Sequence, residues 1–114
     1  MTASEARRRF ASARLAHLAS VDPRGRPHLV PITFALVADT IYSAVDDVKP
    51  KRTLALRRLA NVAANPAVAV LVDHYEEDWA GLWWVRADGH ARTIDVSKTE
   101  AQDALAALAT RYAP

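Results

Sequence analysis

Five positive side chains fall within the twelve residues 48–59, VKPKRTLALRRL, where the sequence predicts the start of a helix. Pro50 suits the first turn of a helix, because its missing N–H group is no loss there. If Asp47 caps this helix, the cations form an ordinary solvated helix face. If Lys49 is the cap, its ammonium group cannot accept the free backbone N–H groups, which with the helix dipole and the cations would bind an anion such as a phosphate. Residue chemistry leaves both interpretations open.

The formal charge is unevenly divided along the chain. Residues 1–58 hold 11 Lys and Arg against 5 Asp and Glu, whereas residues 59–114 hold 4 against 8. The two parts therefore carry +6 and −4, which sum to the net charge of +2. The basic part favours an anionic partner. Because no nucleic-acid-binding motif accompanies the charge, we expect a small phosphorylated ligand and no nucleic acid.

The sequence contains no motif of a nucleophilic or metal-dependent enzyme. Its three glycines are too scattered for a dinucleotide fingerprint or a phosphate-binding P-loop. It has no cysteine, and its four histidines lack the spacing of metal ligands, so no metal site is expected. The segment DHYEED, residues 73–78, is more simply a solvated turn than a metal site. His17 and His28 are more simply strand residues than an acid–base pair.

Length and hydropathy favour a small soluble protein. At 114 residues, the chain has a common size for one domain, and we expect a single domain over residues 1–114. No stretch approaches the roughly 20 consecutive apolar residues of a membrane span. The N-terminal segment MTASEARRRF lacks the apolar core of a signal peptide. We therefore expect a cytoplasmic protein without a membrane partner.

The elements that must position these residues follow from hydrophobic periodicity and turn signals. Three helices are predicted, at residues 4–13, 50–64 and 96–113. Five strands are predicted, at residues 13–21, 26–37, 39–45, 67–75 and 82–95. Many short strands with few helices favour a small antiparallel barrel.

Capping residues and an apolar stripe define the three predicted helices. Ser4 is the expected N-cap of the first helix. Ser97, with Glu100 three residues later, is the expected capping box of the last. The basic helix is expected to bury one stripe with i, i+3, i+4, i+7 spacing: Leu56, Leu59, Ala60 and Ala63.

Two of the predicted strands carry further information. Residues 67–75, AVAVLVDHY, are almost wholly apolar at first, so we expect a central strand that is buried on both faces. Trp83 and Trp84 are adjacent in the next strand and must project to opposite faces. We expect one in the core and the other at a ligand site or subunit interface. A turn or bulge is expected at Asp88 and Gly89, and Trp79 is expected at the surface.

The order of several short motifs adds a family resemblance. The series RFASARLAHLASVDPRGRPHLVPITFAL, followed by AVDDVKPKRTLALRRLANVAANPAVAVLVDHYEEDWAGLWWVRADGHA, resembles the pyridoxamine-phosphate-oxidase-like (PPOX-class) split-barrel superfamily. More closely, it is similar to the branch of deazaflavin (coenzyme F420)-dependent oxidoreductases. The resemblance covers nearly the whole chain. It implies a mainly β fold with flanking helices, an FMN-binding-type split β-barrel, and a homodimer with its coenzyme in a groove between subunits.

The resemblance also implies the coenzyme-binding residues. The phosphate is implied to bind at the helix after the third strand, at four residues: Lys49, Lys51, Arg52 and Thr53. The ring system is implied to lie along the second and third strands, at six residues: Pro31, Ile32, Thr33, Ser43, Ala44 and Val45. Arg57 would contact the coenzyme only from the groove side of the helix.

The implied activity is hydride transfer between coenzyme F420 and a small organic substrate. The alternatives are an FMN-dependent oxidoreductase of the same fold and a carrier that binds the coenzyme without turnover. The sequence identifies no proton donor and no substrate. Relatives continue beyond RYAP into a further strand, so the resemblance implies that the last strand of the family is missing here and that one barrel edge is open.

Overall fold

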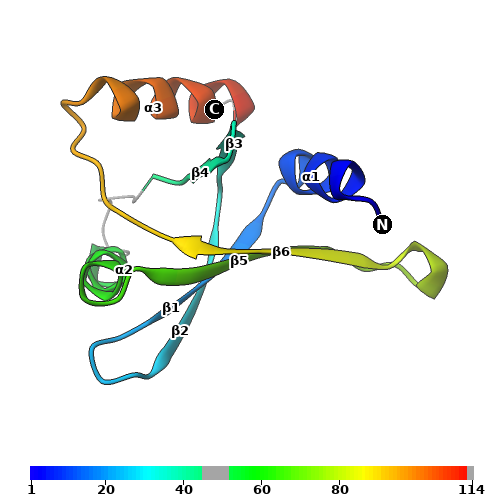
Figure 1. The fold of residues 1–114 in the computed structure, drawn as a ribbon, viewed down its shortest axis with the longest axis horizontal. Helices are drawn as coiled ribbons and strands as arrows, with labels where there is room; N and C mark the ends of the chain where they lie inside the picture. The colour runs from blue at the N-terminus through cyan, green and yellow to red at the C-terminus, as the bar shows by residue number, and fades with distance from the viewer. Residues whose placement is uncertain (45–51, 113–114) are drawn as a thin grey trace.

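The computed structural model describes residues 1–44 and 52–112, with side chains described for residues 1–44 and 57–112. Three α-helices and six strands follow one another along this part of the chain (Figure 1). The helices are α1 (Ala3–Ser12), α2 (Arg52–Ala64) and α3 (Thr99–Arg111), and a short 3-10 helix, η1, covers Trp79–Gly81. The strands are β1 (Ala16–Val21), β2 (Pro27–Ile32), β3 (Ala35–Val37), β4 (Thr40–Tyr42), β5 (Ala67–His74) and β6 (Trp83–His90).

The strands form two antiparallel sheets. Four strands pair in the order β2-β1-β5-β6, and β3 pairs with β4 in a small hairpin. In Figure 1, α3 lies over this hairpin, while α1 and α2 lie near opposite ends of the larger sheet. Among the described residues no strand pairing joins the two sheets, so the barrel is not closed. The expectation of a mainly β fold with flanking helices is confirmed.

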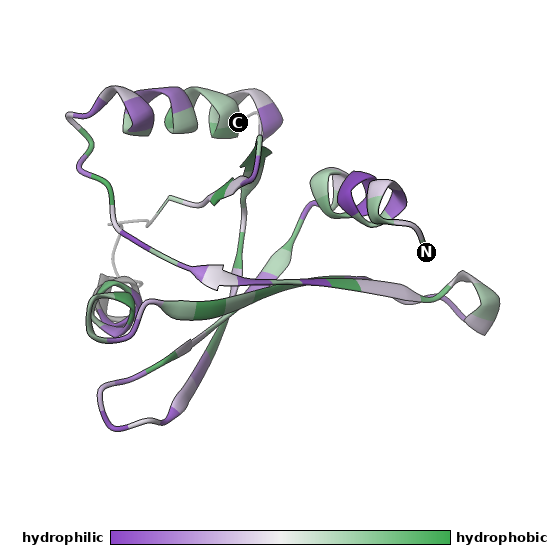
Figure 2. Cartoon of the chain, in the orientation of Figure 1, coloured by the Kyte–Doolittle hydropathy of each residue, from purple (hydrophilic) through white to green (hydrophobic). Residues whose placement is uncertain are grey.

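The register gives the larger sheet an inner and an outer face. Leu18 pairs with Val70, and Val70 with Ala87, so these three side chains share the inner face. The core on this side includes Phe10 from α1 and Phe34 from the segment after β2, whose rings meet edge to face at 5.2 Å. In Figure 2, hydrophobic colour follows much of β5 and hydrophilic colour the β1–β2 turn.

The outer face of the sheet is more open than expected. β5 is central, as predicted, with Val70 and Val72 buried on its inner side. Ala69 and Leu71, on its outer side, are only half-buried. The prediction of burial on both faces is therefore wrong, because within the described chain the helices pack against the inner face and the sheet ends.

The predicted strand 26–37 is two strands, β2 and β3. The chain turns inward at Phe34, whose side chain is fully buried. Its backbone N–H donates to the Tyr112 hydroxyl at 3.1 Å instead of to a neighbouring strand. The following predicted strand, 39–45, is only the three-residue β4, and its residue Val45 lies outside the described residues.

The strand β6 is shorter and more regular than predicted. Gly89 pairs with Val68, and Asp88 with Ala69, so neither a turn nor a bulge interrupts it there. The strand ends at His90, and the next backbone N–H, that of Ala91, donates to a loop carbonyl at Pro66.

Both predicted helix caps are wrong. The N-cap of α1 is Thr2, which forms a reciprocal capping box with Glu5, so Ser4 lies inside the helix. The N-cap of α3 is Lys98, which makes no side-chain cap bond. Glu100 does not cap α3, because its carboxylate is bound by Arg92 and the Tyr42 hydroxyl.

The helix α2 buries a polar side chain where an apolar stripe was predicted. Asn61 is 3% exposed, and its amide donates to the Ser20 hydroxyl of β1 at 3.3 Å. Leu59 is half-buried as expected, but Ala60 and Ala63 are exposed. The helix is rotated because the sheet beneath it presents the hydroxyl of Ser20, which has to be hydrogen-bonded. Among the described residues, no helix is long and apolar enough to cross a membrane.

Candidate functional site

The ends of β2 and β4 meet where the coenzyme ring was predicted to bind. The Ser43 hydroxyl donates to the Thr33 carbonyl at 2.8 Å, which holds the two segments together. Pro31 and Thr33 are exposed, whereas the side chain of Ile32 is buried in the core. Only the backbone of Ile32 is therefore available to a ligand. Ala44 is exposed beside Ser43.

Much of the predicted phosphate site lies outside the described residues. This holds for Lys49, Lys51 and Val45. Arg52 and Thr53 are the first residues of α2, and their side chains are likewise outside the described part. The helix is described from Arg52 onward, so its predicted start at Pro50 also falls outside.

One arginine that was not among the predicted site residues reaches this region. Arg58 of α2 donates from its guanidinium to the Ala44 carbonyl at 3.3 Å. Its side chain is partly buried, and this burial lowers the pKa of Arg58, although a guanidinium stays charged. The neighbouring Arg57 is exposed. Within the described residues, no carboxylate forms a salt bridge with Arg58, so its desolvated charge has a carbonyl as its described partner.

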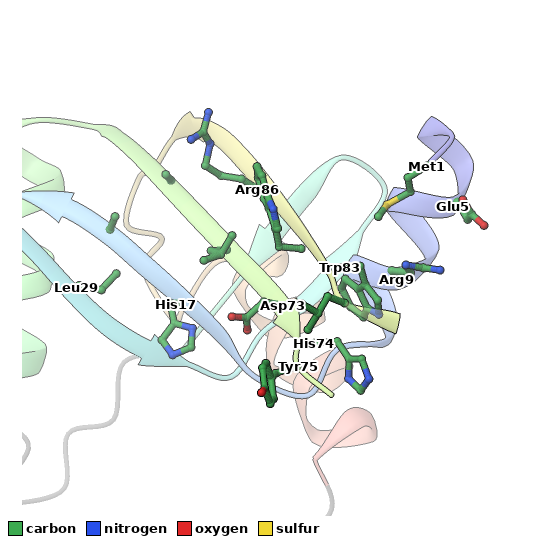
Figure 3. A pocket seen from close by; sticks show the side chains of 15 residues that line it. Met1, Glu5, Arg9, His17, Leu29, Asp73, His74, Tyr75, Trp83 and Arg86 are labelled. Carbon is green, nitrogen blue, oxygen red and sulfur yellow. The ribbon is translucent and has the colours of Figure 1, made fainter. Parts of the chain in front are cut away.

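A hollow of about 1090 Å³ opens on the outer face of the larger sheet. Its described lining includes none of the residues predicted to bind the phosphate. Apolar and ionisable side chains line it together, as Figure 3 shows. Leu29, Leu71 and Trp84 are apolar members, and His17 and Asp73 are ionisable ones.

An aromatic stack stands at one end of this hollow. The Trp83 ring lies 5.9 Å from the imidazole of His74 in a stacked arrangement, and the Arg9 guanidinium lies 5.3 Å from the same indole. The His74 Nε2 atom is 3.6 Å from a Glu76 carboxylate oxygen. Trp83 packs against the core, whereas Trp84 is 63% exposed, so the prediction of opposite faces is confirmed.

The two histidines of the first hairpin lie on different faces. His28 pairs with the buried Ser20 on the inner face, and its Nδ1 atom is buried without a partner among the described residues. His17 pairs with Pro31 on the outer face and lines the hollow. They cannot act together, which agrees with the interpretation as strand residues. The described residues contain no group of three His, Asp or Glu able to hold a metal ion.

A polar cluster attaches the start of α3 to the rest of the molecule. The Tyr42 hydroxyl donates to a Glu100 oxygen at 2.7 Å, and the Arg92 guanidinium reaches both oxygens at 2.9 Å. The Tyr42 hydroxyl and then Arg92 lower the pKa of Glu100, while the bond to Glu100 raises the pKa of Tyr42. A smaller hollow of about 370 Å³ lies beside this cluster.

Comparison with known proteins agrees with this architecture. The family model described as pyridoxamine 5'-phosphate oxidase matches residues 2–113. No curated protein matches the chain. A conserved hypothetical protein of Mycobacterium tuberculosis is structurally similar, with a TM-score of 0.81 and 22% identity. So are a heme-binding protein of Mycobacterium smegmatis (TM-score 0.75, 23% identity) and an FAD-binding protein of Mesorhizobium loti (TM-score 0.69, 23% identity).

These similarities show the fold, which is that of the expected split barrel. The similarity to the M. tuberculosis protein covers 99% of this chain and 65% of that protein. For the M. smegmatis protein, it covers 96% of this chain and 42% of that protein. For the M. loti protein, it covers 96% of this chain and 76% of that protein. The chain thus spans less than two thirds of the length of the first two. Their names include both a flavin and a heme, so the fold alone does not select the cofactor.

Proposed function

Because the chain belongs to the pyridoxamine 5'-phosphate oxidase family, we propose that it is an oxidoreductase that binds coenzyme F420 and transfers a hydride between the coenzyme and a small organic substrate. The alternative within the same fold is FMN. A structural neighbour named as FAD-binding supports a flavin-type coenzyme. The choice of F420 over FMN rests on the sequence resemblance.

The observation that carries this proposal is the position of Arg58. Among residues 1–44 and 57–112, whose side chains are described, the partly buried Arg58 has no carboxylate partner, and a bound phosphate would compensate its desolvated charge. Arg58 lies beside Ala44, at the end of the segment that Ser43 joins to Thr33. The described residues therefore fit an anionic group at the start of α2 with a ring system extending along β2.

In this proposal the coenzyme supplies the redox chemistry and the protein residues bind and orient it. When bound, a deazaflavin supplies two electrons as a hydride, and FMN supplies comparable two-electron chemistry. Arg58, with Lys51 and Arg52, binds the phosphate. The backbone at Pro31 to Thr33 holds the ring edge, and Ser43 keeps the two strand ends in register. The protein supplies binding, orientation and exclusion of water, which needs no nucleophile.

A pair of adjacent arginines offers a matched test of this site. The Arg58→Gln variant should bind F420 at least about tenfold more weakly, because one charge-assisted bond to phosphate is worth roughly 1.5–3 kcal/mol. The Arg57→Gln variant should bind like wild type. Replacing Lys51 and Arg52 together by alanine should weaken binding by at least about a hundredfold. Fluorescence titration with F420 and with FMN measures all four proteins.

The outcomes separate the alternatives. Equal affinity of wild type and Arg58→Gln would remove Arg58 from the site. A clear preference for FMN would move the protein to the FMN-dependent class. Binding of heme with no binding of F420 or FMN would overturn the proposed function. A bound coenzyme that no hydride acceptor reoxidises would favour the carrier.

A further inference from the structure

His17 is the histidine closest in the sheet to the proposed ring site. It is a direct cross-strand neighbour of Pro31, which begins the ring-binding segment of β2. Such neighbours have Cβ atoms roughly 4.5–5.5 Å apart on the same face. On its other side, His17 pairs with Leu71 of β5, in the middle of the sheet. A ring lying on the Pro31 backbone is therefore within reach of this imidazole.

The imidazole is available to a ligand. His17 is half-buried and lines the outer hollow. Among residues 1–44 and 57–112 it has no hydrogen-bond or ion-pair partner, and its nitrogen atoms are not enclosed. The other histidines differ. His28 faces inward, His74 is stacked on Trp83 at the end of β5, and His90 lies at the far end of β6.

The charged groups that face His17 come from three elements. β2 contributes none on the outer face, where its residues are Pro27, Leu29 and Pro31. β5 contributes Asp73, two residues along from the partner Leu71, and Figure 3 shows its carboxylate and the His17 imidazole on neighbouring strands on the same side of the sheet. The remaining ionisable groups lining the hollow are Glu5 and Arg9 of α1, the chain terminus at Met1, His74, Tyr75, and Arg86 of β6.

We propose that His17 contacts the ring system of the bound coenzyme in the outer hollow, and that its imidazole N–H donates a hydrogen bond to a ring carbonyl or ring nitrogen. This inference rests on the proposed function. Flavin and deazaflavin rings are flat, apolar on their faces and rich in acceptors along one edge. Leu29, Leu71 and the small residue Ala19 give the hollow an apolar floor, and His17 adds a donor at its β2 side.

The contact adds one hydrogen bond to coenzyme binding. The His17→Ala variant loses the donor and should therefore bind F420 and FMN about threefold to tenfold more weakly than wild type.

Matched variants isolate this effect. Glutamine keeps a donor of similar size, so His17→Gln should lose less affinity than His17→Ala. The His90→Ala variant, changed at an exposed histidine outside the hollow, should bind with the wild-type affinity.

A second measurement does not depend on affinity or activity. In protein labelled with ¹³C at histidine Cε1, saturation with oxidised F420 or FMN should shift the His17 resonance and leave that of His90 in place. A coenzyme that binds while the His17 signal stays unmoved would overturn the contact. Equal affinity of wild type and His17→Ala would overturn the hydrogen bond. Failure of both coenzymes to bind would instead remove the proposed function on which the inference rests.

Discussion

Arg57 and Arg58 are chemically identical neighbours that differ in role because of where α2 places them. Successive residues of a helix point about 100° apart. Arg57 therefore extends into solvent, while Arg58 turns toward Ala44 and loses part of its hydration. A lysine at position 58 would keep the charge but lose the planar fork that binds phosphate with two bonds.

Ala38 is a second residue whose backbone position matters more than its chemistry. It occupies the turn between β3 and β4 with a φ of 52°, in the left-handed region. Its carbonyl accepts a bond from Arg7, which also pairs with Asp39 at 3.0 Å. The turn is thus held from α1, and the alanine Cβ is crowded against its own backbone.

Replacing Ala38 by glycine should stabilise the protein. Relief of roughly 1–2 kcal/mol of left-handed strain exceeds the roughly 0.5–1 kcal/mol of extra chain entropy that glycine loses. We expect a gain of about 0.5–1 kcal/mol in the free energy of unfolding, measured by urea denaturation with an unchanged slope.

The control for Ala38 is the exposed Ala106 in α3, where glycine should reduce stability by about 1 kcal/mol because the residue is helical. If the Ala38→Gly variant were also destabilised, the strain at the turn would be too small to matter.

At the scale of elements, α3 is attached at both ends by polar contacts. Its start is held by the cluster of Glu100, Tyr42 and Arg92. Its end is held by Arg111, which donates to the carbonyls of Ala11, in the last turn of α1, and of its C-cap residue Ala13. The Tyr112 hydroxyl, just beyond the helix, adds the contact to Phe34. Only small residues of α3 are buried, so these polar contacts position the helix.

The Glu100 cluster predicts a pH-dependent stability. Its folded pKa lies below the usual value of 4.5, so Glu100 stabilises the protein above that pH and loses its contribution as pH falls through its folded pKa. The Glu100→Gln variant should melt at a lower temperature than wild type at pH 7. The difference should shrink as pH falls below about 4.5. Thermal unfolding followed by circular dichroism from pH 7 to pH 3 measures this.

Asp103→Asn supplies the comparison, since Asp103 is exposed one turn further along α3 and has no hydrogen bond among the described contacts. Its melting temperature at pH 7 should remain close to that of wild type. A constant difference between Glu100→Gln and wild type at every pH would show that ionisation of Glu100 is not what holds the helix.

At the scale of the whole molecule, the outer sheet face is the surface on which we propose that two chains associate. Leu29 and Trp84 are 67% and 63% exposed on this face, beside the half-buried Leu71. Trp84 projects from this face beside the hollow. A two-fold pairing buries the projecting indole of each chain at the interface and leaves the hollow as a groove between the two chains. Such a patch is seldom left open in a monomer.

Trp84→Arg should therefore dissociate the dimer. Light scattering at micromolar concentration should give twice the chain mass for wild type and the single chain mass for the variant. The matched control is Trp79→Arg, at a tryptophan of η1 that is even more exposed and does not line the hollow, and it should remain dimeric. A monomeric wild type would disprove the homodimer, and a dimeric Trp84→Arg would place the interface elsewhere.

Local patterns in the sequence determined the order of helices and strands, the central position of β5 and the opposite directions of Trp83 and Trp84. Each depends on a period of two or 3.6 residues, or on turn residues, all within about ten positions. The sequence resemblance led to the family and to the pairing of the β2 end with Ser43. It did not select Arg58.

Contacts between residues far apart in the sequence determined the features of the fold that local patterns did not predict. The rotation of α2 depends on Asn61 meeting Ser20, and the break after β2 depends on Tyr112 meeting Phe34. These partners are 41 and 78 residues apart, so no local pattern indicates them. A buried polar group must find its partner wherever the fold brings one. That requirement, which only the tertiary structure can satisfy, turned Asn61 toward Ser20 and Arg58 toward the Ala44 carbonyl beside the predicted coenzyme site.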